Sequence, residues 1–71
     1  MFHNARLARQ RRAELTKARE ELDDMRTELM EAYAHFDRIA DTELLDACIF
    51  HISALSARYD ATLRQVKRKF E

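Results

Sequence analysis

The chain has 71 residues with a formal net charge of zero, and it contains no glycine, proline or tryptophan. A chain this short forms one small domain, which buries only about 60% of the surface that its unfolded form exposes. The lack of glycine and proline disfavours tight hairpin turns and internal helix breaks, so the composition favours long helices. No apolar run approaches the roughly 18 residues that a bilayer-spanning helix needs, and the first residues do not resemble a secretory signal.

The first helix is predicted over about residues 4–36. Apolar residues repeat there with gaps that alternate between three and four, which is the heptad pattern of a helix lying along another helix. The positions that follow this pattern are Leu15, Ala18, Leu22, Met25, Leu29, Ala32, Phe36 and Ile39. Before Leu15 the pattern fades, so we expect this end to fray or to need a partner.

A short turn is predicted at about residues 37–41, and a second helix at about residues 42–70. Asp41 or Thr42 can cap the start of this helix by accepting a backbone N–H. Its apolar face is predicted to carry Leu45, Ile49, Ile52, Leu55, Tyr59, Leu63, Val66 and Phe70. A turn this short forces the two helices to be antiparallel neighbours. The predicted fold is therefore all-α: a coiled-coil-like antiparallel two-helix hairpin that forms one domain over residues 1–71. We predict that two such hairpins pair as a dimeric four-helix bundle.

A second stripe on helix two has the spacing of another contact surface. Its residues are Ala47, Phe50, Ala54, Ala57 and Ala61. Folding the hairpin places Met30 and Tyr33 near the level of Phe50, and we predict that these seven residues form a self-association surface. The alternative is that alanine fills exposed positions because it is the best helix former, which does not explain Phe50.

The charges are separated along the chain. Ten of the 13 acidic residues lie between Glu20 and Asp46, whereas residues 1–19 and 58–71 hold eleven of the 13 basic residues. An antiparallel hairpin brings both ends of the chain to one basic tip, which could bind RNA or DNA phosphates. The candidate phosphate-binding residues are Arg6, Arg9, Arg11, Arg12, Arg64, Lys67, Arg68 and Lys69. Solvated charges that pair within each helix, head-to-tail or antiparallel self-association of the basic tip with the acidic middle of the chain, an acidic protein surface and anionic lipid remain alternatives.

Few residues offer catalytic or metal-binding chemistry. Glu31 and His35, and separately Cys48 and His51, have spacings that place two metal ligands on one helical face. A turn centred near residue 40 would hold the two histidines more than two helical turns apart, so we predict no metal site. Cys48 is alone and faces the core, which indicates a structural thiol in a reducing cytoplasm. We expect no enzymatic activity, no cofactor and no small-molecule substrate.

Helix two resembles part of a known family. The stretch DTELLDACIF at residues 41–50, followed by Ile52, Ala54, Arg58-Tyr59, Leu63 and Lys67, resembles the YaaL-like family of small bacterial proteins of unknown function. The resemblance covers about residues 37–69. It implies a helical hairpin of cytoplasmic, bacterial origin and supplies no catalytic residues.

The sequence therefore predicts a small non-enzymatic interaction or adaptor protein that acts through helix–helix association, with a homodimer as the favoured assembly. The alternative prediction is nucleic-acid binding through the basic tip.

Overall fold

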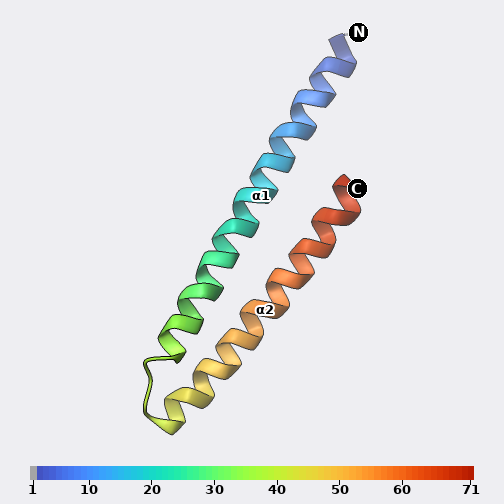
Figure 1. The fold of residues 1–71 in the computed structure, drawn as a ribbon. Coiled ribbons are helices and arrows are strands. Elements are labelled where there is room, and N and C mark those ends of the chain that lie inside the picture. Colours follow the sequence, from blue (N-terminus) through green and yellow to red (C-terminus); the bar gives the residue numbers. More distant parts are fainter. Residues whose placement is uncertain (1) are drawn as a thin grey trace.

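The computed structural model describes the backbone of residues 2–71 and the side chains of residues 3–71. The chain forms two helices, α1 (Phe2–Phe36) and α2 (Thr42–Phe70), which run antiparallel in a thin rod of 62 × 17 × 12 Å (Figure 1). The predicted all-α helical hairpin is confirmed. Helix α1 begins two residues earlier than the sequence indicated, because nothing in residues 2–14 interrupts it.

Helix α1 ends without a left-handed residue. The Asp37 N–H donates to the Tyr33 carbonyl at 3.1 Å, and the Ile39 N–H donates to the Phe36 carbonyl at 3.2 Å. The second of these bonds spans three residues rather than four, so the last turn tightens as the chain leaves the helix. No residue in the described part of the chain has a positive φ angle, which fits a sequence without glycine.

Asp41 caps the start of α2. Its backbone is extended, with φ −77° and ψ 125°, and its carboxylate accepts the N–H groups of Glu43 at 2.9 Å and Leu44 at 3.2 Å. These bonds satisfy two of the donors that a helix start leaves unpaired. The structure thus selects Asp41 over Thr42 as the cap.

The two helices meet along a seam of paired layers. Leu15 and Leu22 line one groove with Leu63, Val66 and Phe70, which fixes how far each helix is advanced along the other. Continuing this offset toward the turn gives the layers Leu15/Phe70, Ala18/Val66, Leu22/Leu63, Met25/Tyr59, Leu29/Leu55, Ala32/Ile52, Phe36/Cys48 and Ile39/Leu45. Leu55 is buried, with 5% of its surface exposed, and the other seam residues are half-buried.

One predicted face residue of α2 lies outside this seam. Ile49 is 48% exposed, and Cys48 takes the half-buried position instead. The reason is the spacing, since the three-and-four gaps from Leu45 to Tyr59 pass through Cys48. The gap from Leu55 to Tyr59 is four residues, and the next gap, from Tyr59 to Leu63, is four residues again. This repeat keeps the seam residues of α2 facing those of α1.

The register differs from the one expected for a turn centred near residue 40. Helix α2 starts beyond the end of α1, and the connecting loop runs alongside its first turn (Figure 1). Ile39 consequently lies level with Leu45, and Phe70 lines grooves with Leu15 and Leu22 as well as with Ala8, Arg11 and Arg12. The expected register, with the turn centred near residue 40, was wrong because Ile39 of the loop packs as a further layer of the seam. The loop therefore does not form a symmetrical turn between the two helix ends.

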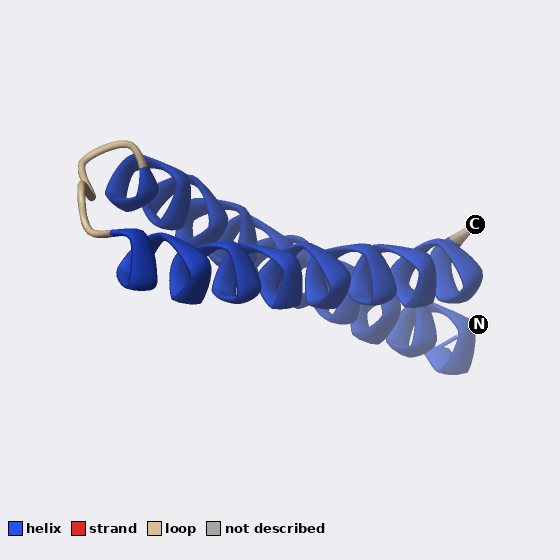
Figure 2. Cartoon of the chain, turned by 90° about the horizontal axis from the view of Figure 1, so that it is seen from below, coloured by secondary structure: helices blue, strands red, loops and turns tan. Residues whose placement is uncertain are grey.

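The same offset leaves the first part of α1 without a neighbouring helix. Residues 3–14, which we call the overhang, project past the end of α2 and are all exposed (Figure 1). Both chain ends lie at one end of the rod and the loop lies at the other (Figure 2). The Arg11 Nη2 atom donates to the Lys69 carbonyl at 3.1 Å, which ties the base of the overhang to the last turn of α2.

Candidate interaction surfaces

Charged side chains border the seam in two columns on α1. Arg12, Arg19 and Arg26 are spaced seven residues apart, and Glu14, Glu21 and Glu28 have the same spacing on the other side of the seam. Seven residues make about two helical turns, so each set lines up along the helix. The rod therefore has two broad surfaces of different charge, which we call the arginine face and the glutamate face.

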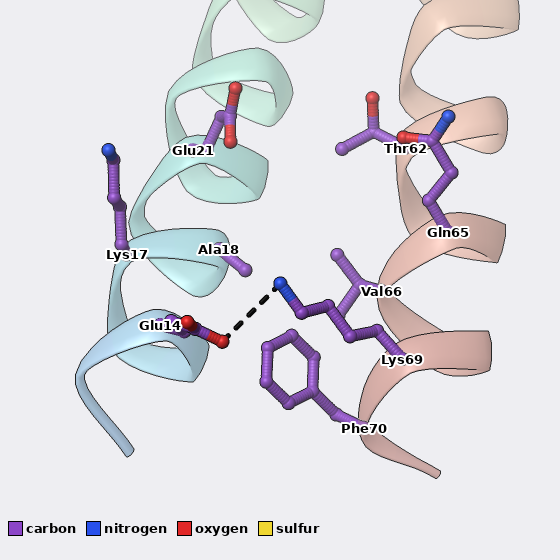
Figure 3. A pocket seen from close by; sticks show the side chains of 9 residues that line it. All are labelled: Glu14, Lys17, Ala18, Glu21, Thr62, Gln65, Val66, Lys69 and Phe70. Atoms are coloured by element: carbon purple, nitrogen blue, oxygen red, sulfur yellow. Dashed lines mark ion pairs between the residues drawn. The ribbon is translucent and has the colours of Figure 1, made fainter. Parts of the chain in front are cut away.

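The glutamate face carries an open groove of about 360 Å³ (Figure 3). The groove lies near the end of the rod that holds both chain ends, which we call the free end. Glu14 and Lys69 form an ion pair across it, with 3.3 Å between Oε2 and Nζ. The Lys69 ammonium also lies 5.5 Å from the centre of the Phe70 ring, within the range of a cation–π contact. Of the two lysines that line this groove, Lys69 has both an anionic and an aromatic partner, whereas Lys17 has no ion-pair partner among residues 3–71.

The arginine face carries a groove of about 260 Å³ at the same end of the rod. Its apolar lining consists of seam residues near the free end: Leu15 and Leu22 of α1 and Leu63, Val66 and Phe70 of α2. Arg19 of α1 and Lys67 of α2 line it as well, so each helix contributes one cation, and Glu71 at the end of the chain adds one carboxylate. The Glu14–Lys69 contact is the one ion pair among residues 3–71, which leaves Arg19 and Lys67 free to attract an anionic group.

The structure distributes the predicted self-association residues over different surfaces. By helical position, Met30 and Tyr33 lie on the arginine face, Ala47 and Ala54 lie on the glutamate face, and Phe50 points away from the seam. Ala57 also lies on this outer side of α2, and Ala61 is half-buried. Phe50 is 76% exposed and Met30 is 65% exposed. These seven residues therefore do not form one continuous surface.

The predicted phosphate-binding residues are all exposed but are also divided. Arg6 and Arg9 lie on the overhang, and Arg11 is bonded to the end of α2. By helical position, Arg9, Arg12, Arg64 and Lys67 share the arginine face, Lys69 lies on the glutamate face, and Arg68 points away from the seam.

Sequence reasoning on the basic tip left out one member of the arginine column. Arg26 lies seven residues after Arg19 and well inside the paired part of the hairpin. The signal that could have found it was present, because the seven-residue spacing of the apolar heptad also applies to the residues that border it. Basic charge is therefore organised by face as well as by end.

The register also changes where the two histidines lie. His35 and His51 are on the glutamate face within about one helical turn of each other along the rod, rather than more than two turns apart as expected. Even so, no three His, Cys, Asp or Glu side chains among residues 2–71 are grouped so that they could hold a metal ion. Within the same residues, no helix combines the length and apolarity needed to cross a bilayer.

Comparison with protein families, curated sequences and solved structures finds no match. The resemblance of residues 37–69 to the YaaL-like family thus stays a prediction from the motif. The grooves themselves are open and shallow, and what they offer is apolar and charged surface for docking.

Proposed function

We propose that the protein is a small non-enzymatic interaction module that works by helix–helix association and completes its core by pairing with a second copy. The observation that supports this proposal is that the hairpin buries very few side chains. Among residues 3–71 only Leu55 is buried, while Met30 and Tyr33 are more than half exposed. A four-helix bundle formed from two hairpins would cover such side chains.

The energetics point the same way. Ordering a residue costs about 1–2 kcal/mol of backbone entropy, and fully burying a large apolar side chain returns about 1.5–3 kcal/mol. A seam of half-buried residues returns only part of that amount per side chain. Burial against another copy would add to the stability of both hairpins.

The test is the dependence of mass and thermal stability on protein concentration. We expect sedimentation equilibrium to give the mass of a dimer, and the Tm to rise with protein concentration between about 1 and about 100 µM, because association stabilises the folded state by mass action. A monomeric mass together with a Tm that does not change over this range would overturn the proposal.

A second candidate function, nucleic-acid binding, is favoured by the geometry of the overhang. Residues 3–14 form a bare single helix that carries Arg6, Arg9 and Arg12 past the end of α2. A helix of about 10–12 Å diameter fits a DNA major groove of about 12 Å, and arginines bind phosphates strongly. The same charges would suit an acidic protein surface or anionic lipid.

The test for this second function is a titration with labelled single- and double-stranded RNA and DNA. Binding should weaken steeply between about 50 and about 200 mM salt, since it releases counterions. The triple change of Arg9, Arg11 and Arg12 to glutamate should abolish it without loss of helicity. A control that changes Lys17, Arg38 and Arg58 to glutamate reverses three charges at residues outside the candidate phosphate-binding set and should leave the binding intact.

We also propose a reducing, cytoplasmic setting and a relationship to the YaaL-like bacterial family. The support for the first is a lone, half-buried free cysteine, Cys48. The support for the second is the motif at residues 41–50.

A further inference from the structure

We propose that the arginine face is the surface on which a second copy docks, antiparallel to the first, around a two-fold axis that passes near Arg26. This inference rests on the proposed self-association and adds the face, the orientation and the contacts. It moves the interface from the outer side of α2, where Phe50 lies, to a groove between the helices.

The first argument is that the two halves of the arginine face differ in charge. The half near the free end carries Arg12, Arg19, Arg64 and Lys67 around the groove, with Glu71 in its lining and, by helical position, Asp23 and Asp60 on the same face, so basic residues outnumber acidic ones there. By helical position, the half near the turn carries Asp46 on this face, and Asp37 follows the last turn of α1. An antiparallel second copy places each basic half against an acidic half, whereas a parallel copy places basic against basic.

The second argument is that the apolar parts of this face are complementary. The half near the turn exposes Tyr33 at 51%, Ile49 at 48% and Met30. The half near the free end holds the groove, whose apolar lining includes Leu15 and Phe70. An exposed aromatic and an aliphatic side chain on one half thus match a hollow of about 260 Å³ on the other.

The third argument is that the distances agree. The groove lies at the level of residues 15–22 of α1, and Tyr33 and Ile49 lie at about the level of residues 33–35 of α1. A two-fold rotation about the level of Arg26 exchanges these two levels. It brings Tyr33 and Ile49 of each copy over the groove of the other copy, and it brings Asp46 toward Lys67. Such an interface is self-complementary and closes as a dimer.

The area is sufficient for a specific dimer. The paired part of α1, residues 15–36, is about 33 Å long at 1.5 Å per residue. The rod is 17 Å across its broad face. A strip of these dimensions buries roughly 560 Å² per copy, or roughly 1,100 Å² in all, which exceeds the minimum of about 1,000 Å² for a specific protein interface.

The glutamate face suits this arrangement less well. Glu14 and Glu21 lie toward its free end and Glu28 lies toward its turn, so acidic side chains occupy both halves. Of the two lysines at its groove, Lys69 is already paired with Glu14. An antiparallel copy on this face would bring carboxylates together.

The experiment is a charge exchange in two full-length variants. One variant carries Arg19→Glu and Lys67→Glu, and the other carries Asp37→Lys and Asp46→Lys. We expect each variant alone to be at least about tenfold weaker in dimerisation than the natural chain, and the one-to-one mixture to recover a heterodimer, because opposite charges then meet again. The matched control, Lys17→Glu with Arg58→Glu, makes the same charge change on the glutamate face and should remain dimeric.

Helicity measured by circular dichroism shows whether each variant is folded. The neutral change Tyr33→Ser should also weaken the dimer at least about tenfold, while Phe50→Ser should leave it unchanged. If the natural chain dimerises but only Phe50→Ser weakens the dimer, the interface lies on the outer side of α2, and the arginine-face proposal is overturned while the proposed function stands. If the natural chain is monomeric, the proposed function itself fails.

Discussion

The overhang and the paired part of α1 belong to one uninterrupted helix, yet only one of them is packed. Residues 3–14 are all exposed, whereas from Leu15 onward every heptad position is half-buried against α2 or the loop. The two regions have similar helix-forming composition, and both lack glycine and proline. The comparison shows that local propensity extends this helix and that the apolar heptad decides which part of it is held by tertiary contacts.

The largest expected effect separates the two regions through leucine truncation. Leu55→Ala removes the one buried side chain among residues 3–71 and should lower the free energy of unfolding by about 2–5 kcal/mol, a large part of the stability of a small domain. Leu7→Ala on the overhang, where the side chain is half exposed, should change it by less than about 0.5 kcal/mol. Urea unfolding followed by circular dichroism measures both values. Equal losses would show that the overhang is packed in solution.

The next effect concerns the end of the paired region nearest the turn. Asp41→Ala removes the acceptor for two N–H groups of α2 and should lower the free energy of unfolding by about 1 kcal/mol. Asp41→Asn keeps a capping oxygen and should retain most of the stability. Thermal unfolding of both variants checks this prediction, which fails if alanine and asparagine behave alike.

Changes from alanine to glycine at exposed positions compare the stability of the paired region with that of the overhang and leave the seam residues unaltered. Ala57 lies in the paired region and Ala13 in the overhang, and both are exposed. Ala57→Gly should lower the global free energy of unfolding by about 1 kcal/mol, whereas Ala13→Gly should only increase local fraying. Hydrogen exchange and urea unfolding on the same samples distinguish local from global loss. A global loss for Ala13→Gly would mean that residues 3–14 fold together with the rest.

The smallest effect lies at the boundary between the two regions. The Glu14–Lys69 pair has side chains that are 43% and 63% exposed. A double-mutant cycle with Glu14→Gln and Lys69→Gln should give a coupling of about 0.2–1 kcal/mol that disappears at about 1 M salt. A coupling that survives this salt concentration would indicate that the boundary is more enclosed than the single hairpin shows.

Much of the fold could be predicted from the sequence because the heptad is strong. All eight apolar positions assigned to the seam from Leu15 to Ile39 are half-buried, and Cys48 faces the core as expected. The assignment of Ile49 failed because Cys48 and Ile49 are adjacent, and apolar character alone does not say which of them continues the spacing. The gaps on both sides of Cys48 carry that information.

The register could not be read from the length of the turn. A connection of five residues can close symmetrically, or it can run alongside the next helix as it does before Asp41. What decides between them is the pairing of layers over the whole seam, including the repeated gap of four after Tyr59. Matching the gaps of one helix to those of the other would have given the offset, whereas an estimate of the turn centre did not.

The sequence alone predicted which end of the rod carries the basic residues, but it did not predict on which face each charged residue lies. Charge counts along the chain correctly place basic residues at the free end of the rod. Dividing them between faces requires the seam first, because Arg12 and Glu14 differ by only two positions yet border opposite sides of it. Residues such as Met30 and Ala47 were grouped by level along the rod, and level does not determine face.

The layered seam also has a consequence for how the hairpin forms. The layer at Ile39 and Leu45 joins residues close in the chain, and each later layer closes a loop six to eight residues longer than the layer before it, so the entropic cost of loop closure rises slowly. We therefore expect folding to proceed like a zipper from the Asp41 cap toward Phe70, with rapid kinetics typical of local contacts. Amide protection on the two helices should then decline in step, layer by layer, toward the free end.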